Sequence, residues 1–286
     1  MRIYAILMAI IFLFLSAIQV QVSQAEEFNN STGNTSGYWY AEGSALLSAG
    51  SYNEAIESFN RSLQMEPQSA PVWTLKGFAY YQLNNYDDSI KCSDQAVKVD
   101  PEYAPAWVNK GHALSKLKRY DEAIACYDKA ININQSSASV WNDKGNALFR
   151  LGKYDEASKA FGQATSIDSG YAVAWNNLGT ALSVQEKYDD AVKAYDNALS
   201  ADPQFALAWS NKGSTLAKLG KNDDAMSCFD RALEIDPQFT EAKNSRDALE
   251  TQLQNSTGTT ETSVDMKAKM TSDLSKANEA LNKLKI

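Results

Sequence analysis

Few side chains in this sequence of 286 residues have the type and spacing that catalysis or metal binding requires. His112 is the only histidine, so no second imidazole is available for a metal site. The three cysteines, Cys92, Cys126 and Cys228, include no close pair of the kind that binds zinc. The glycines form no phosphate-binding loop, because they follow a regular spacing of their own. We therefore expect no catalytic residue, no metal and no cofactor, and a protein that is not an enzyme.

That regular spacing is a tryptophan followed four residues later by a glycine, and it returns every 34 residues. The six tryptophans of the chain all lie on it: Trp39, Trp73, Trp107, Trp141, Trp175 and Trp209. A strict period of this length predicts a solenoid of stacked units, each packed on its neighbours. The cysteines share one position of the repeat, so we expect them to be packing residues. Units stacked about 8–10 Å apart are too distant for a disulfide between them.

Each unit contains two stretches with apolar residues at helical spacing, such as residues 104–116 and 121–130. An Asp or Asn near the start of each second stretch predicts a helix N-cap: Asn53, Asp87, Asp121, Asp155, Asp189 and Asp223. Gly50, Asn84, Gly152 and Gly220, which tolerate a left-handed backbone, end four of the first stretches, and Lys118 and Glu186 stand at that place in the other two. Glycine and alanine columns let the two helices approach, and we expect an aromatic column in the second helix to fill the gap, with Ser93 as its weak point.

The tryptophan, glycine, alanine, aromatic and proline columns closely resemble the tetratricopeptide repeat (TPR) family. The resemblance covers residues 36–239 as six units: 36–69, 70–103, 104–137, 138–171, 172–205 and 206–239. It implies an all-α fold, a right-handed superhelical solenoid of six helix-turn-helix repeats. One column departs from the family, which usually has leucine before the glycine. Here it reads Glu42, Lys76, Lys110, Lys144, Leu178 and Lys212. A lysine stem can still cover apolar surface while its ammonium group reaches water.

Residues 240–253 lack the Trp–Gly pair but carry Ala242, Leu249 and Leu253 on one side. This pattern predicts a C-terminal capping helix that covers the last open face of the solenoid. We expect a linker over 254–263 and an amphipathic helix over 264–286. Its apolar stripe is Met270, Leu274, Ala277, Leu281 and Leu284. Docking on the solenoid, pairing with a partner and folding only on binding are open alternatives for this segment.

The N-terminal 25 residues do not belong to the repeats. Arg2, an apolar run over 3–18 and small residues at Ser23 and Ala25 form the pattern of a signal peptide over 1–25. We therefore expect a secreted or extracytoplasmic protein of the cell envelope. The alternative is an uncleaved membrane anchor over residues 3–18. Residues 26–35 are polar and predict a flexible linker.

The charge distribution argues against one class of partner. The formal net charge is -8, and lysines are interspersed among the acids rather than clustered. Binding to a phosphate backbone needs clustered Lys and Arg, so we expect no nucleic-acid partner. A membrane contact is expected only if the N-terminal segment stays uncleaved as an anchor.

The TPR resemblance implies that first helices line a concave groove that binds peptides. The matching columns of this sequence are Asn109, Asp143, Asn177 and Asn211; Asn142 and Asn176; and His112 and Asn146. Side-chain amides can bond both the N–H and the C=O of an extended peptide. We therefore expect a non-enzymatic scaffold that binds a protein or peptide partner in this groove, outside the cytoplasm. A self-associating structural component of the envelope and an accessory ligand-binding subunit of an enzyme system are the alternatives.

Overall fold

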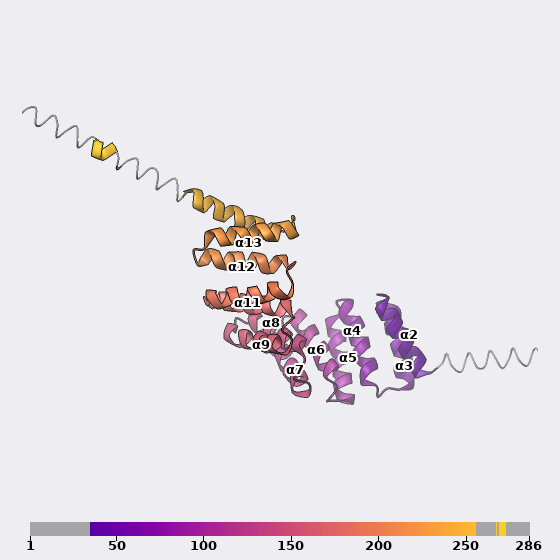
Figure 1. Ribbon diagram of the computed structural model, residues 1–286. Coiled ribbons are helices and arrows are strands. Elements are labelled where there is room, and N and C mark those ends of the chain that lie inside the picture. Colours follow the sequence, from indigo (N-terminus) through magenta and orange to yellow (C-terminus); the bar gives the residue numbers. More distant parts are fainter. Residues whose placement is uncertain (1–34, 256–266, 268, 273–286) are drawn as a thin grey trace, which may run out of the picture. The chain divides into compact units, whose positions relative to one another are not determined.

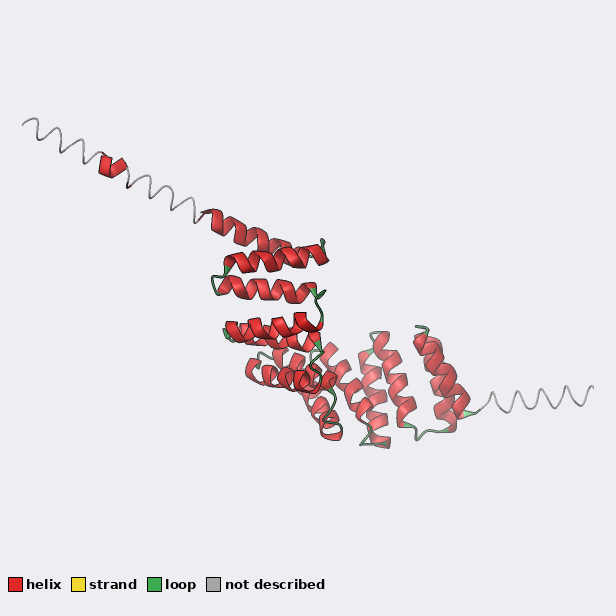
Figure 2. Ribbon diagram, in the orientation of Figure 1, coloured by secondary structure: helices red, strands yellow, loops and turns green. Residues whose placement is uncertain are grey.

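The computed structural model describes residues 35–255, 267 and 269–272, and all regular structure in these ranges is α-helical (Figures 1 and 2). Helices of 13 residues alternate with helices of 14. The shorter, first helices are α2 (Ser36–Ser48), α4 (Ala70–Gln82), α6 (Ala104–Lys116), α8 (Ala138–Arg150), α10 (Ala172–Val184) and α12 (Ala206–Lys218). The longer, second helices are α3 (Tyr52–Met65), α5 (Tyr86–Val99), α7 (Tyr120–Ile133), α9 (Tyr154–Ile167), α11 (Tyr188–Ala201) and α13 (Asn222–Ile235). The all-α solenoid of paired helices is confirmed.

The described helices fall into two compact units. The N-terminal unit ends at Gly152 and holds α2 to α8, and the C-terminal unit starts at Lys153 and holds α9 to α13. A further helix over residues 240–255 follows α13 and buries Ala242 and Leu249. Leu249 packs in one cluster with Leu216, Cys228 and Phe229, as expected of a cap, and the helix runs two residues into the predicted linker.

In four helix pairs, an aromatic ring lies against the glycine of the first helix, at Gly43, Gly111, Gly179 and Gly213. A methyl group added at Gly111 would lie 2.5 Å from the Tyr127 ring, and one at Gly179 would lie 2.7 Å from the Tyr195 ring. Those rings are only 1% and 2% exposed. The glycine column is therefore required for close helix approach, and the second-helix aromatics are the most deeply buried large side chains.

The tryptophans play a different part, because they are only half-buried. In the N-terminal unit, the indole N–H of Trp107 donates to the carbonyl oxygen of Pro101 at 2.9 Å, and in the C-terminal unit that of Trp209 donates to Pro203 at 3.1 Å. Trp73, Trp141 and Trp175 make the same bond to the residue six positions earlier. Each of these tryptophans thus fastens the turn that precedes its own helix.

The helix ends correct one sequence expectation and confirm another. The predicted Asx caps lie inside the first turn of each second helix, and the cap residues precede them: Ser51, Asn85, Arg119, Lys153, Lys187 and Lys221. The five aspartates among the predicted Asx residues therefore interact with the helix dipole and do not cap the helix. The left-handed residues after the first helices are as expected, and Lys118 and Glu186 adopt φ of 60° without being glycine.

No helix within the described ranges is both long enough and apolar enough to cross a membrane. The predicted signal segment 1–25, most of the linker 26–35 and most of residues 256–286 lie outside the described residues. Met270, from the predicted C-terminal stripe, is described and is 68% exposed.

Candidate functional site

In the N-terminal unit, aromatic and ionisable side chains gather on the first helices. We name Phe78 and Tyr81 of α4, His112 of α6 and Asp143 of α8 the aromatic cluster. Helical spacing explains it, because Phe78 and Tyr81 are three residues apart and so share one face of α4. The Phe78 and Tyr81 rings stack with centroids 6.3 Å apart, and the Tyr81 ring lies 6.3 Å from the His112 ring.

His112 connects two repeats through its imidazole. Its Nε2 lies 2.8 Å from Oδ2 of Asp143, and its ring lies 5.9 Å from the ring of the buried Tyr127. The side chains of His112 and Asp143 remain 36% and 27% exposed, so a ligand can reach both. Lys116 adds a cation, with its Nζ 6.0 Å from the Tyr81 ring. The cluster therefore offers aromatic surface, a carboxylate and an ammonium group within a small area.

The side-chain amide of Asn109 already makes one hydrogen bond within the protein. Its Nδ2 donates to the carbonyl oxygen of Thr74 on α4 at 3.1 Å. This bond ties α6 to α4 and uses one of the two N–H donors of Nδ2, while Oδ1 stays available as an acceptor. Asn142 on α8 is 4% exposed, which assigns it to packing between helices rather than to contact with a ligand, whereas Asn146 is exposed.

In the C-terminal unit, the same columns carry amides and hydroxyls. We name Asn176, Asn177 and Asn211 the amide cluster. Nδ2 of Asn211 on α12 donates to Oδ1 of Asn176 on α10 at 2.9 Å, and Nδ2 of Asn176 lies 3.5 Å from Oδ1 of Asn177. Asn176 is 3% exposed, so it holds Asn177 and Asn211 in place from a buried position and is not itself a contact residue. Asn177 and Asn211 are half-buried and remain candidates for contact.

Beside the amide cluster, two apolar side chains face solvent. Val173 and Leu207, the second residues of α10 and α12, are 44% and 39% exposed. Buried hydroxyls connect the same two helices, with Oγ of Ser183 3.2 Å from Oγ1 of Thr215. This face is neutral and combines amide groups with small apolar patches.

The lysine column that departs from the TPR pattern forms regular contacts between repeats. Lys110, Lys144 and Lys212 each pair with the aspartate sixteen residues earlier, on the preceding second helix: Asp94 at 2.6 Å, Asp128 at 2.5 Å and Asp196 at 2.7 Å. The ammonium groups also lie 5.4–5.8 Å from the rings of Trp107, Trp141 and Trp209. Arg246 and Asp230 continue the series at 2.8 Å. We name these contacts the ion ladder. The three lysine side chains are only 18–24% exposed, so their stems cover apolar surface while the ammonium groups reach the carboxylates.

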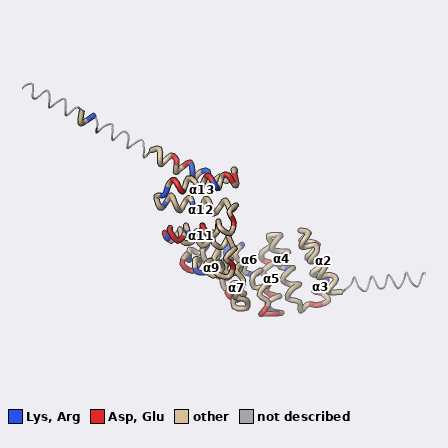
Figure 3. The backbone as a smooth tube through the Cα atoms, viewed as in Figure 1, with Lys and Arg blue, Asp and Glu red and all other residues tan. Residues whose placement is uncertain are grey.

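The ion ladder is interrupted inside the C-terminal unit, where both columns change together. Leu178 of α10 stands at the lysine place, and Gly162 of α9 stands at the aspartate place. Second helices carry more of the charges outside this ladder than first helices do, and first helices such as α2, α4 and α12 are mainly uncharged (Figure 3).

The cysteines lie in the core and not at either cluster. All three are free and buried, and Cys126 and Cys228 pack within core clusters. Burial raises the pKa of the Cys92 and Cys126 thiols to about 11, and it also raises the pKa of the Cys228 thiol. Few thiolates therefore exist at neutral pH, which disfavours nucleophilic chemistry. Within the described residues, no three His, Cys, Asp or Glu side chains come together as a metal site.

The sequence pointed to His112 and Asp143 as separate groove residues but did not show that they pair. It did not single out Phe78 and Tyr81. A signal existed for the aromatic residues, because they stand on the first helix one and four residues after Gly77. The pairing needed the three-dimensional stack, since His112 and Asp143 are 31 residues apart.

The helix pairs, the glycine–aromatic packing and the 34-residue period define a tetratricopeptide repeat protein. Among family models, the one described as the cilia and flagella-associated protein 70 C-terminal domain matches residues 23–280, and the chain belongs to this family. A search of curated proteins found no match to the sequence.

Solved structures show the same fold. YrrB, described as a TPR protein with an unusual peptide-binding site, is 20% identical with a TM-score of 0.58, and the match covers 67% of this chain and 99% of YrrB. PilF of Pseudomonas aeruginosa is 19% identical with a TM-score of 0.65, covering 74% of this chain and 97% of PilF. MamA is 24% identical with a TM-score of 0.54, covering 58% of this chain and 96% of MamA.

Proposed function

We propose that this protein is a non-enzymatic scaffold that binds a segment of a partner protein on its first helices. The observation that carries the proposal is the aromatic cluster, where Phe78, Tyr81 and the His112–Asp143 pair lie close together at a partly exposed surface. Aromatic side chains are enriched at protein interfaces because they bury a large area with little loss of rotamer entropy. The peptide-binding site named for YrrB, a protein of the same fold, supports this proposal.

The chemistry of the cluster indicates what a partner offers. Tyr81 and Phe78 suit an apolar or aromatic side chain, and Asp143 and Lys116 suit groups of opposite charge at its ends. Asn109 can accept one backbone N–H through Oδ1. A mixed peptide segment fits these groups better than a nucleic acid does, because the formal net charge of the chain is -8.

Affinity capture with matched variants tests the proposal. The full chain and a Tyr81→Ala variant would be offered to proteins of the host's cell envelope and medium, with Met65→Ala as the control. Met65 is 45% exposed on a second helix, away from the first-helix columns. We expect a partner that wild type and Met65→Ala retain and that Tyr81→Ala loses while its circular dichroism is unchanged. Equal retention by all three baits would contradict the proposed site.

We further propose that the protein acts outside the cytoplasm. This rests on the sequence of residues 1–25 alone, with Arg2, the apolar run 3–18 and small residues at Ser23 and Ala25. Mass spectrometry of the N-terminus of the protein from its host tests it. A mature N-terminus at Glu26 is expected, and retention of residues 3–18 would favour an anchor instead.

A further inference from the structure

Two columns at the junctions between repeats change together along the chain. The first is the residue just before the helix that follows each second helix, and the second is the third residue of that following helix. The pairs are Ser69 with Val72, Tyr103 with Ala106, Ser137 with Val140, Tyr171 with Ala174, Phe205 with Ala208 and Phe239 with Ala242. An aromatic residue thus stands beside alanine, and a serine stands beside valine.

The aromatic residue fills the junction where it is present. In the N-terminal unit, Tyr103 packs against the buried cluster of Ala70, Ala96 and Ala106. In the C-terminal unit, Phe205 packs in the same way against Ala198 and Ala208. Alanine at the second column leaves the space that the ring occupies. A Ser–Val pair must therefore fill the same space with one valine side chain and no ring.

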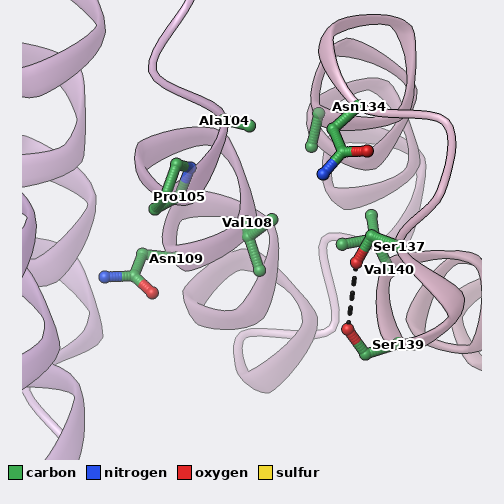
Figure 4. Close-up of a pocket in the computed structure, with 9 residues that line it drawn as sticks. Ala104, Pro105, Val108, Asn109, Asn134, Ser137, Ser139 and Val140 are labelled. Carbon is green, nitrogen blue, oxygen red and sulfur yellow. Dashed lines mark hydrogen bonds between the residues drawn. The ribbon is translucent and has the colours of Figure 1, made fainter.

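At Ser137 that replacement leaves a cavity of about 310 Å³ between α6, the end of α7 and the start of α8 (Figure 4). Pro105, Val108 and Val140 form its apolar walls together with Ala104 and Ala130. No Asp, Glu, Lys or Arg is among the residues that line it. A charged group placed here would lose water without gaining a partner of opposite charge. The cavity therefore selects for an uncharged apolar occupant.

The rim of the cavity carries a hydrogen-bond donor for a backbone. Asn134 stands where the other repeats have an acid: Glu66, Asp100, Asp168, Asp202 and Asp236. Its Oδ1 accepts from the backbone N–H of Ser136 at 3.0 Å and from Oγ of Ser136 at 2.7 Å. Its Nδ2 turns toward the side of α6 that carries Pro105 and Val108 (Figure 4). The Oγ atoms of Ser137 and Ser139 lie 3.2 Å apart beside it and keep this part of the rim polar.

We propose that this cavity is a subsite for one uncharged apolar side chain, of the size of leucine or phenylalanine, from the bound partner segment. The Nδ2 of Asn134 donates to a backbone carbonyl next to that side chain. The subsite rests on the proposed binding of a peptide segment. It adds a sequence preference for the bound segment, because Pro105, Val108 and Val140 favour an apolar residue at one position of that segment and disfavour a charged one.

Capped amino acids test the subsite without knowledge of the partner. The probes are N-acetyl-leucinamide, N-acetyl-phenylalaninamide and, as a charged control, the N-acetyl amide of aspartate. We expect the first two to shift the NMR methyl signals of Val108 and Val140 in the full chain, and to saturate at about millimolar concentration, as ligands of this size do. The aspartate probe should bind at least tenfold more weakly. A failure of both apolar probes to saturate these signals would overturn the proposal.

A matched pair of variants locates the binding. Ser137→Tyr with Val140→Ala installs the aromatic–alanine pair that Tyr103 and Ala106 form at another junction, so it should fold and fill the cavity. Ser69→Tyr with Val72→Ala makes the same change outside it. We expect at least a tenfold loss of probe binding in the first variant, read at Val108, and wild-type binding in the second. Equal binding by both would overturn the proposal.

A second variant tests the subsite independently if the first variant folds poorly. Val140→Ala alone enlarges the cavity, so the preference should move from the leucine probe toward the phenylalanine probe. An unchanged ratio of the two affinities would contradict the subsite.

The subsite and the proposed function fail in different ways. A partner that is captured by the full chain and by the Ser137→Tyr, Val140→Ala variant alike, and lost from Tyr81→Ala, would keep the scaffold function and overturn the subsite. Saturable probe binding without any captured partner would keep the subsite and overturn the scaffold function.

Discussion

In the N-terminal unit, the first helices present aromatic rings and the His112–Asp143 pair, whereas in the C-terminal unit the same columns present Asn177, Asn211 and hydroxyl groups. Both units rest on the same frame, because Tyr127 and Tyr195 close their helix pairs against glycine in the same way. This difference shows that one set of repeat positions determines how the helices pack and another set determines the exposed surface. A repeat can therefore change what it binds without changing how it packs.

The two units also differ in their weak points. The N-terminal unit has serines in two packing columns, Ser89 and Ser93, both fully buried with hydroxyls that have no hydrogen-bond partner. The C-terminal unit has Ala191 at the first of these columns, and its weak point is the interruption of the ion ladder at Gly162 and Leu178. Substitutions can remove each weak point from its own unit or introduce it into the other unit.

The largest effect should come from breaking what the units share. Gly111→Ala and Gly179→Ala should each lower the free energy of unfolding by about 2 kcal/mol, because the new methyl group overlaps a buried ring that cannot move away. Gly77→Ala is the control. Its methyl group would meet Cys92 and Ser89 at 3.2 Å, and the gain of about 1 kcal/mol in helix propensity offsets that contact. Urea unfolding measures all three, and an equal loss at Gly77 would contradict the argument.

A smaller effect should come from exchanging the buried hydroxyl. Ser89→Ala should raise the free energy of unfolding by about 1 kcal/mol, because it removes a buried polar group that lacks a partner. Ala191→Ser makes the reverse change in the C-terminal unit and should lower it by a similar amount. Hydrogen exchange resolved by helix would show each change in its own unit. Stabilisation by Ala191→Ser would mean that the hydroxyl finds a partner there.

Completing the ion ladder should have an effect of about 0.5 kcal/mol. In a double-mutant cycle, Gly162→Asp and Leu178→Lys should show a favourable coupling of this size, since such pairs are partly exposed. Lys110 and Asp94 provide the existing pair for comparison, with side chains 24% and 47% exposed. Both couplings should shrink in 1 M salt because of screening. A coupling that is independent of salt would show that packing, and not charge, connects these columns.

The smallest effect should come from the left-handed residues. Lys118→Gly in the N-terminal unit and Glu186→Gly in the C-terminal unit should each raise the free energy of unfolding by up to about 0.5 kcal/mol, because glycine adopts φ of 60° without steric cost but gains entropy in the unfolded chain. Thermal unfolding measures both. Gly152→Lys, which reverses the exchange at a third such residue with φ of 75°, should destabilise.

The sequence by itself determined the repeat, its period and the pairing of helices. The spacing of tryptophan and glycine requires that each repeat pack on the next, since one pair of helices cannot bury its own apolar face. The left-handed turns were also readable, because the turn geometry recurs even where Lys118 and Glu186 replace glycine. Helix starts were misplaced, since an acidic residue serves equally well as a cap or within the first turn.

The tertiary structure alone decided which side chains of different repeats meet. His112 meets Asp143, Lys110 meets Asp94, and Nδ2 of Asn109 donates to the carbonyl oxygen of Thr74, all through the stacking of repeats. It also decided that Ser137 leaves a cavity, because an empty volume depends on what neighbouring helices do not fill. Local periodicity fixes the faces of a helix, whereas the distance and rotation between stacked helices fix the contacts, and these arise only when the whole repeat packs.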